Sequence, residues 1–143
     1  MKIQYPIITI SGKSHIEFIT NDRDLKICNK RALKNGYYNN LTIIDSGSKK
    51  IKIQSAKKEG TAGFLWGLNL FKGQQLVVSL NYSEKIERVK LNEFQKLLIK
   101  LINKDKYFWD SDNNLKKRID FIINANSIEN ILERFTFEYF ERY

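Results

Sequence analysis

Cysteine, proline and histidine are almost missing from this chain of 143 residues, which contains one of each. The lone Cys28 excludes an internal disulfide, and the lone His15 excludes a histidine-rich metal site. No apolar run approaches the roughly 20 residues that cross a bilayer, and the first residues lack the apolar core of a signal peptide. We therefore expect a cytoplasmic protein with no metal, no cofactor and no membrane association.

Glycine- and serine-rich stretches that could link two domains are also missing, and the sequence has no repeat of fixed period. Hydrophobic residues make up 42% and aromatic residues 13% of the chain. That content is too high for a disordered chain, because enough apolar area is present to offset the entropy of ordering. We expect a single domain over residues 1–143.

The first two-thirds of the chain has the alternation of apolar and polar residues that is typical of β-strands. Pro6 cannot donate to a ladder and so predicts an edge position for the first strand. Strands are expected at residues 3–5 with 7–10, 15–20, 41–45, 49–56, 62–71, 75–82 and 85–91, with a hairpin turn at 46–48 and a charged turn at 57–60.

Helical periodicity occurs in one early segment and again in the last third. Asn21 or Asp22 can cap a helix that ends at Gly36, with Leu25 and Cys28 on its apolar stripe. Three more helices are expected, beginning after Asn92, after Ser111 or Asp112, and at Ser127, while residues 136–143 fit either a strand or a helix. The sequence thus predicts an α+β fold. We expect an antiparallel meander of about five to six strands, one helix inserted in the N-terminal half, and two to three C-terminal helices packed on the sheet.

Side chains with catalytic potential lack the partners that catalysis needs. His15 lies on a predicted strand with the apolar neighbours Ile16 and Phe18. Cys28 lies on the apolar side of a predicted helix, where burial raises a thiol's pKa. Asp110 with Asp112 fits a helix start, and the glycine-containing segment 60–63 lacks the lysine of a phosphate-binding loop. We therefore expect no enzyme and no catalytic residue.

Basic residues dominate the charge, with a net value of +9. Residues 1–60 contain 12 basic against 5 acidic residues, 61–125 contain 11 against 7, and 126–143 contain 2 against 4. A positive field accelerates encounter with acidic proteins, nucleic acids or anionic membranes without choosing among them. A lysine-rich composition without a binding role is the alternative interpretation.

The basic residues recur at regular intervals, and this spacing indicates a binding surface. On the first predicted helix, lysines four residues apart form a positive ridge, and two tyrosines follow it that could stack on a ligand. A second ridge is expected at Lys96, Lys100 and Lys104. The predicted partner-binding residues are Lys26, Lys30, Lys34, Tyr37, Tyr38, Lys50, Lys52, Lys57 and Lys58.

A family resemblance runs through residues 20 to 135. Its segments are 32–37, 41–47, 50–53, 77–80, 91–94 and 125–128, together with Cys28 and Trp66-Gly67. This pattern resembles small immunity proteins that bacteria encode beside polymorphic or contact-dependent toxins. The resemblance implies a cytoplasmic protein that binds the acidic surface of a cognate toxin domain in stoichiometric amounts and blocks its activity. A nucleic-acid-binding module with a basic surface stays as the alternative.

Overall fold

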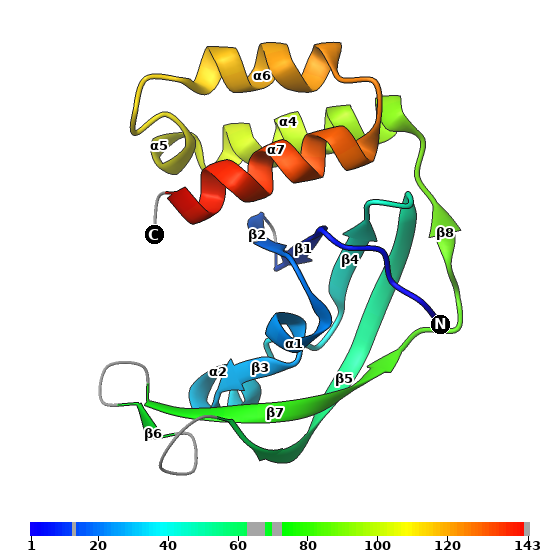
Figure 1. Ribbon diagram of the computed structural model, residues 1–143, viewed down its shortest axis with the longest axis vertical. Coiled ribbons are helices and arrows are strands. Elements are labelled where there is room, and N and C mark those ends of the chain that lie inside the picture. Colours follow the sequence, from blue (N-terminus) through cyan, green and yellow to red (C-terminus); the bar gives the residue numbers. More distant parts are fainter. Residues whose placement is uncertain (13, 63–67, 70–72, 142–143) are drawn as a thin grey trace.

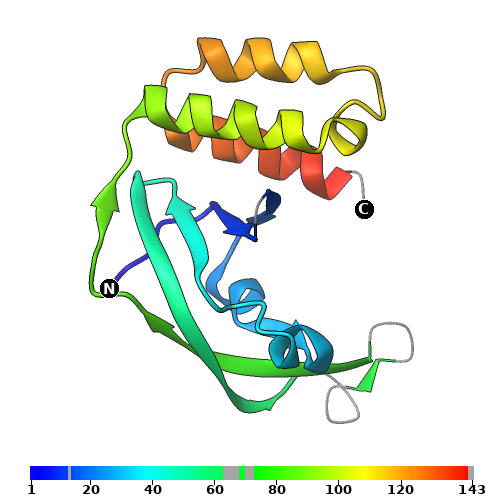
Figure 2. The same ribbon diagram turned by 180° about the vertical axis from the view of Figure 1, so that it is seen from behind.

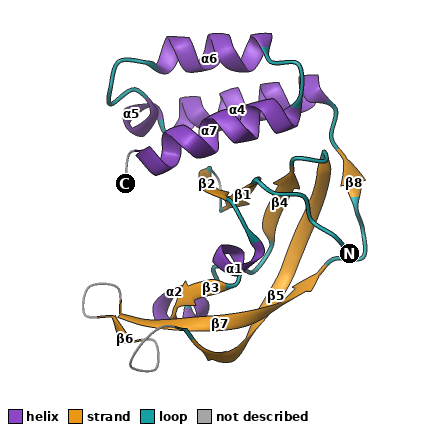
Figure 3. Cartoon of the chain, viewed as in Figure 1, coloured by secondary structure: helices purple, strands orange, loops and turns teal. Residues whose placement is uncertain are grey.

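The computed structural model describes residues 1–12, 14–62, 68–69 and 73–141. Figure 1 shows a strongly curled antiparallel sheet with a layer of helices at one end, and Figure 3 shows that the helices of this layer all come from the C-terminal part of the chain. The predicted α+β class, with C-terminal helices on an antiparallel sheet, is confirmed.

Six strands follow one another in the order β2-β1-β4-β5-β7-β3, and two short strands pair with β7 and β5. The strands are β1 (Ile7–Ser11), β2 (His15–Ile19), β3 (Ile27–Asn29), β4 (Leu41–Asp45), β5 (Lys49–Thr61), β6 (Leu68–Asn69), β7 (Gly73–Tyr82) and β8 (Glu87–Arg88). All of the pairings are antiparallel. β5 and β7 are the longest strands, with 13 and 10 residues, and they pair with each other.

Both faces of the sheet are buried at β1. Consecutive residues of this strand point to opposite faces, and each face packs into its own core. Ile8 belongs to a core shared with the helical layer, whereas Ile7 belongs to a second core inside the curl. Leu25 and Cys28, which lie in the segment between β2 and β4, also belong to this second core. The sheet therefore separates two hydrophobic cores, and residues between β2 and β4 pack into the inner one.

The helical layer consists of α4 (Leu91–Lys104), α5 (Lys106–Trp109), α6 (Leu115–Asn124) and α7 (Ile128–Glu141). Figure 2 shows α7 nearest the sheet and α6 on the outside. Phe18 of β2 contacts Trp109, Phe135 and Tyr139, with ring centroids 5.8 to 6.2 Å apart. These aromatic contacts fasten the layer to the sheet. The short helix α5 had not been predicted, and residues 136–141 continue α7 rather than forming a strand.

The single helix predicted between residue 22 and Gly36 is wrong. The segment forms α1 (Asp22–Leu25), then β3, then α2 (Lys30–Lys34). Cys28 pairs with Leu76 of β7, and the side chain of Asn29 accepts a hydrogen bond of 2.7 Å from the backbone N–H of Ala32. The unpaired edge of β7 thus draws three residues out of the helical pattern, because ladder bonds and core burial outweigh helix propensity.

Several smaller predictions also fail. Residues 3–5 form no strand, since β1 begins at Ile7, and the strand expected at 85–91 is reduced to the two residues of β8. Pro6 does not mark an edge, since it precedes β1, which is paired on both sides by β2 and β4. The charged turn at 57–60 is absent, because β5 continues to Thr61 along β7. The strand expected at 62–71 lies mostly outside the described residues, within which only β6 is found.

Candidate functional site

The lysines of β5 form the first candidate site. Ile51 and Ile53 are completely buried, so Lys52 between them is turned to the opposite, exposed face of the strand. Further along, Lys57 and Lys58 are both exposed, and the pairing of β5 with β7 shifts register just after them. Because Lys57 and Lys58 are consecutive in regular register with β7, their side chains point to opposite faces of β5, the strand that runs away from the helical layer in Figure 1.

Ion pairing distinguishes these lysines from Lys50 and Lys85. The Nζ atoms of Lys50 and Lys85 lie 3.2 and 2.6 Å from the carboxylate oxygens of Glu87, and these contacts lower the pKa of Glu87. Within the described part of the chain, Lys52, Lys57 and Lys58 form no ion pair. We refer to these three residues as the β5 lysine row.

The predicted ridge of Lys26, Lys30 and Lys34 is wrong, because no single helix carries the three residues. Lys26 follows α1, and its Nζ lies 2.7 Å from the carboxylate of Asp22, which raises the pKa of the lysine. Lys30 and Lys34 are exposed at the two ends of α2. The structure therefore divides the predicted site and leaves only the β5 part together.

The two predicted contact tyrosines are not surface platforms. Tyr38 is only 2% exposed, and its hydroxyl donates a 2.9 Å hydrogen bond to the carbonyl of Leu25, so its proposed role in stacking is wrong. Tyr37 is half-buried, and its hydroxyl donates to the carboxylate of Glu17. Burial, together with nearby negative groups, raises the pKa of both phenols. These tyrosines belong to the lining of a cleft rather than to the basic surface.

This cleft, which sequence reasoning missed, has a volume of about 640 Å³ and lies between β2, α1 and β3. His15 is exposed, and its Nε2 lies 3.2 Å from Glu17 Oε1. Cys28 also lines the cleft, but burial raises the pKa of its thiol and makes it a poor nucleophile. The only sequence signal is the acid Glu17 between apolar neighbours on β2, and it becomes informative only once the curl is known.

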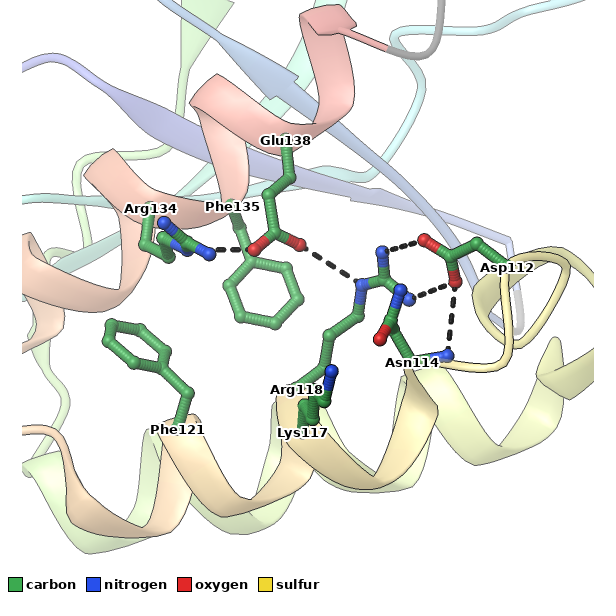
Figure 4. Close-up of a pocket in the computed structure, with 8 residues that line it drawn as sticks. All are labelled: Asp112, Asn114, Lys117, Arg118, Phe121, Arg134, Phe135 and Glu138. Carbon is green, nitrogen blue, oxygen red and sulfur yellow. Dashed lines mark hydrogen bonds and ion pairs between the residues drawn. The ribbon is translucent and has the colours of Figure 1, made fainter.

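A second cavity of about 640 Å³ lies between α6 and α7 (Figure 4). Arg118 donates to both carboxylate oxygens of Asp112 at 2.7 and 2.6 Å, to Glu138 at 3.0 Å and to the backbone carbonyl of Trp109 at 2.8 Å. Arg134 binds the other oxygen of Glu138 at 2.7 Å. With its guanidinium engaged by three protein partners, Arg118 fastens α6 to α7 and has little capacity for a ligand.

The described residues offer neither a metal cluster nor a membrane-spanning helix. In that part of the chain, no three histidine, cysteine, aspartate or glutamate side chains gather to hold a metal ion. None of its helices has both the length and the apolarity to span a bilayer.

Comparison with known proteins gave no relative: no family model, no curated protein and no solved structure matches the chain.

Proposed function

We propose that this chain is a non-catalytic binding protein whose β5 lysine row, with Lys50 beside it, holds the acidic surface of a partner protein. One observation carries the proposal: three exposed lysines lie on one strand without an ion pair, whereas Lys26 is paired with Asp22, and Lys50 and Lys85 are paired with Glu87. The six steps of strand from Lys52 to Lys58 span about 20 Å. A row of that length fits within a standard protein–protein contact of about 800 Å² on each side.

A strand is a suitable carrier for such a row. The backbone of β5 is fixed by pairing with β4 on one side and β7 on the other, so its lysines are held in position before a partner arrives. Uncompensated surface charge acts mainly on the rate of encounter, which it can raise well above about 10⁶ M⁻¹s⁻¹ at low salt. Rapid capture is what a protective inhibitor needs, because a toxin must be bound before it acts.

The partner we propose is a bacterial toxin domain, which makes this chain an immunity protein of a polymorphic or contact-dependent toxin system, acting in the cytoplasm. The support is the resemblance of segments such as 32–37, 41–47 and 91–94 to such proteins, together with a surface that fits an acidic partner. The proposed mechanism is stoichiometric occlusion of the toxin, with no covalent step.

The test is co-expression with the product of the adjacent reading frame, followed by measurement of the association rate. Replacing Lys52, Lys57 and Lys58 with Glu is expected to lower the association rate at least tenfold and to abolish protection of cells. The matched control carries the same charge change on the helical layer, through Lys96→Glu, Lys100→Glu and Lys116→Glu. Retained rapid binding in the β5 variant, or an equal loss in both variants, would overturn the assignment of the surface. A neighbouring gene without toxicity would overturn the toxin proposal.

Nucleic acid is the other polyanion that a row of lysines can bind. If it is the ligand, affinity falls steeply with salt for many sequences, and replacing three phosphate contacts lowers the logarithmic salt slope by about three. Gel retardation of duplex DNA and single-stranded RNA at low salt measures this directly. Retardation that depends on the β5 lysine row would replace the toxin proposal, whereas no retardation removes this alternative.

A further inference from the structure

The cleft between β2, α1 and β3 has a charge opposite to that of the whole molecule. The chain contains 25 lysines and arginines, yet none of those within residues 1–12, 14–62, 68–69 and 73–141 lines this cleft. Its ionisable lining consists of His15, Glu17, Asp24, Cys28, Tyr37 and Tyr38. Two carboxylates without a lining cation therefore form a local negative region in a strongly basic protein.

Glu17 is held rigidly at the centre of this region. It lies on β2 directly opposite Thr9 of β1, which fixes its backbone. One carboxylate oxygen lies 3.2 Å from the His15 ring, and the other accepts a hydrogen bond from the hydroxyl of Tyr37. A carboxylate has about four acceptor sites, so these contacts leave capacity for a further donor. About 34% of the Glu17 side chain is exposed, and that donor can therefore reach it.

The pKa shifts of the two tyrosines agree with a locally negative cleft. Burial raises the pKa of both Tyr37 and Tyr38, and the charge of Glu17 raises both further. The two rings pack edge to face, with centroids 5.0 Å apart. The cleft thus combines a fixed carboxylate with the partly exposed ring of Tyr37, and both features attract cations.

We propose that this cleft binds an ammonium or guanidinium group carried on a short apolar stem. The cationic group contacts Glu17 and Asp24, and the stem lies against Ile27 and Ala32, which also line the cleft and are partly exposed. Such a group is found on a small free amine or on a lysine or arginine side chain of a partner polypeptide. The proposal does not depend on the β5 lysine row, which attracts the opposite charge.

The experiment is a titration followed by amide chemical shifts at pH 7, with three probes. Benzylamine represents a free amine, N-acetyl-arginine amide represents a polypeptide side chain, and benzyl alcohol is the neutral control. We expect shifts concentrated at residues 15–17, 24–29 and 37–38 with the cationic probes and none with benzyl alcohol. Binding of only one cationic probe identifies the source of the group. Equal binding of benzyl alcohol, or no localised shifts with either cation, would overturn the proposal.

Variants test the role of the carboxylate. Glu17→Gln keeps the size of the side chain and an acceptor for Tyr37, and it is expected to weaken binding of the cationic probe at least tenfold. Glu133→Gln, on α7 outside the cleft, is the control and is expected to leave binding unchanged. If Glu17→Gln fails to fold, Asp24→Asn decides, with an expected loss of at least threefold. Unchanged affinity in the folded cleft variant would refute a cation site.

Discussion

Replacing Arg118 with Met tests whether a charged network fastens the outer helix α6 to α7. The Arg118 side chain is 7% exposed and its partner Glu138 18%, so the pair is mostly removed from water. Methionine keeps the apolar stem and removes the guanidinium. Breaking a buried ion pair by removing one partner costs about 3–5 kcal/mol, because the other charge is left buried.

Two features of this site reduce the expected loss. Asp112 is 41% exposed and regains water, and Glu138 keeps the guanidinium of Arg134 at 2.7 Å. We therefore expect Arg118→Met to lower the free energy of unfolding by about 2–3 kcal/mol. The matched control is Arg134→Met, which removes the other partner of Glu138. Since the Arg134 side chain is 56% exposed, the expected loss is about 0.5 kcal/mol.

Urea unfolding followed by far-ultraviolet circular dichroism measures both values. With a slope of about 1–3 kcal/mol per molar urea, the midpoint of Arg118→Met should fall by about 1–2 M, and that of Arg134→Met by a few tenths. A double variant of Arg118 and Glu138 should lose less than the two single changes together, because they break one network. Equal losses of stability in Arg118→Met and Arg134→Met would refute the idea that burial makes the contribution of Arg118 to stability the larger one.

The cysteine and the tyrosines give two further predictions. Because Cys28 is 8% exposed and burial raises its thiol pKa, iodoacetamide at pH 8 should modify it at least a hundredfold more slowly in the native protein than in 6 M urea, and native modification at the unfolded rate would contradict its place in the core. Folding raises the phenol pKa of Tyr5, Tyr37 and Tyr38, so stability is complete below about pH 10 and falls above it, where unfolded phenols ionise first. Burial raises the pKa of Tyr82 as well, so the slope should reach at least about 4 kcal/mol per pH unit, and Tyr38→Phe should lower it by about 1.4. Urea midpoints that stay constant from pH 9 to 11.5 would contradict this.

The spacing of apolar residues predicted correctly those elements that turn one apolar side toward one core. The strand at 41–45 and the long helices near Asn92 and Ser127 carry apolar residues at the period of their own structure. The strand was predicted with its observed bounds, and each helix was predicted to begin within a few residues of its observed start. The exposed position of Lys52 also followed from alternation with Ile51 and Ile53. Each prediction needs only the direction of successive side chains.

The β5 lysine row was predicted only in part. Lys57 and Lys58 were expected at the end of a hairpin, whereas they lie within a strand that continues to Thr61. The length of β5 depends on its partner β7, and no local signal in 57–60 carries that information. Strand length is therefore a property of the pair rather than of either segment.

By itself, the sequence determined the class of the fold, the basic character of the surface and the burial of Cys28, because composition and periodicity encode these directly. Only the tertiary structure decided that the segment from Asp22 to Gly36 breaks into two helices around a strand, since the open edge of β7 offers ladder bonds that no local pattern reports. The curl of the sheet likewise moved Tyr38 into the core and brought Glu17 and Tyr37 together across twenty residues of chain. Contacts between distant segments depend on topology, and topology made both the acidic cleft and the division of the predicted lysine site.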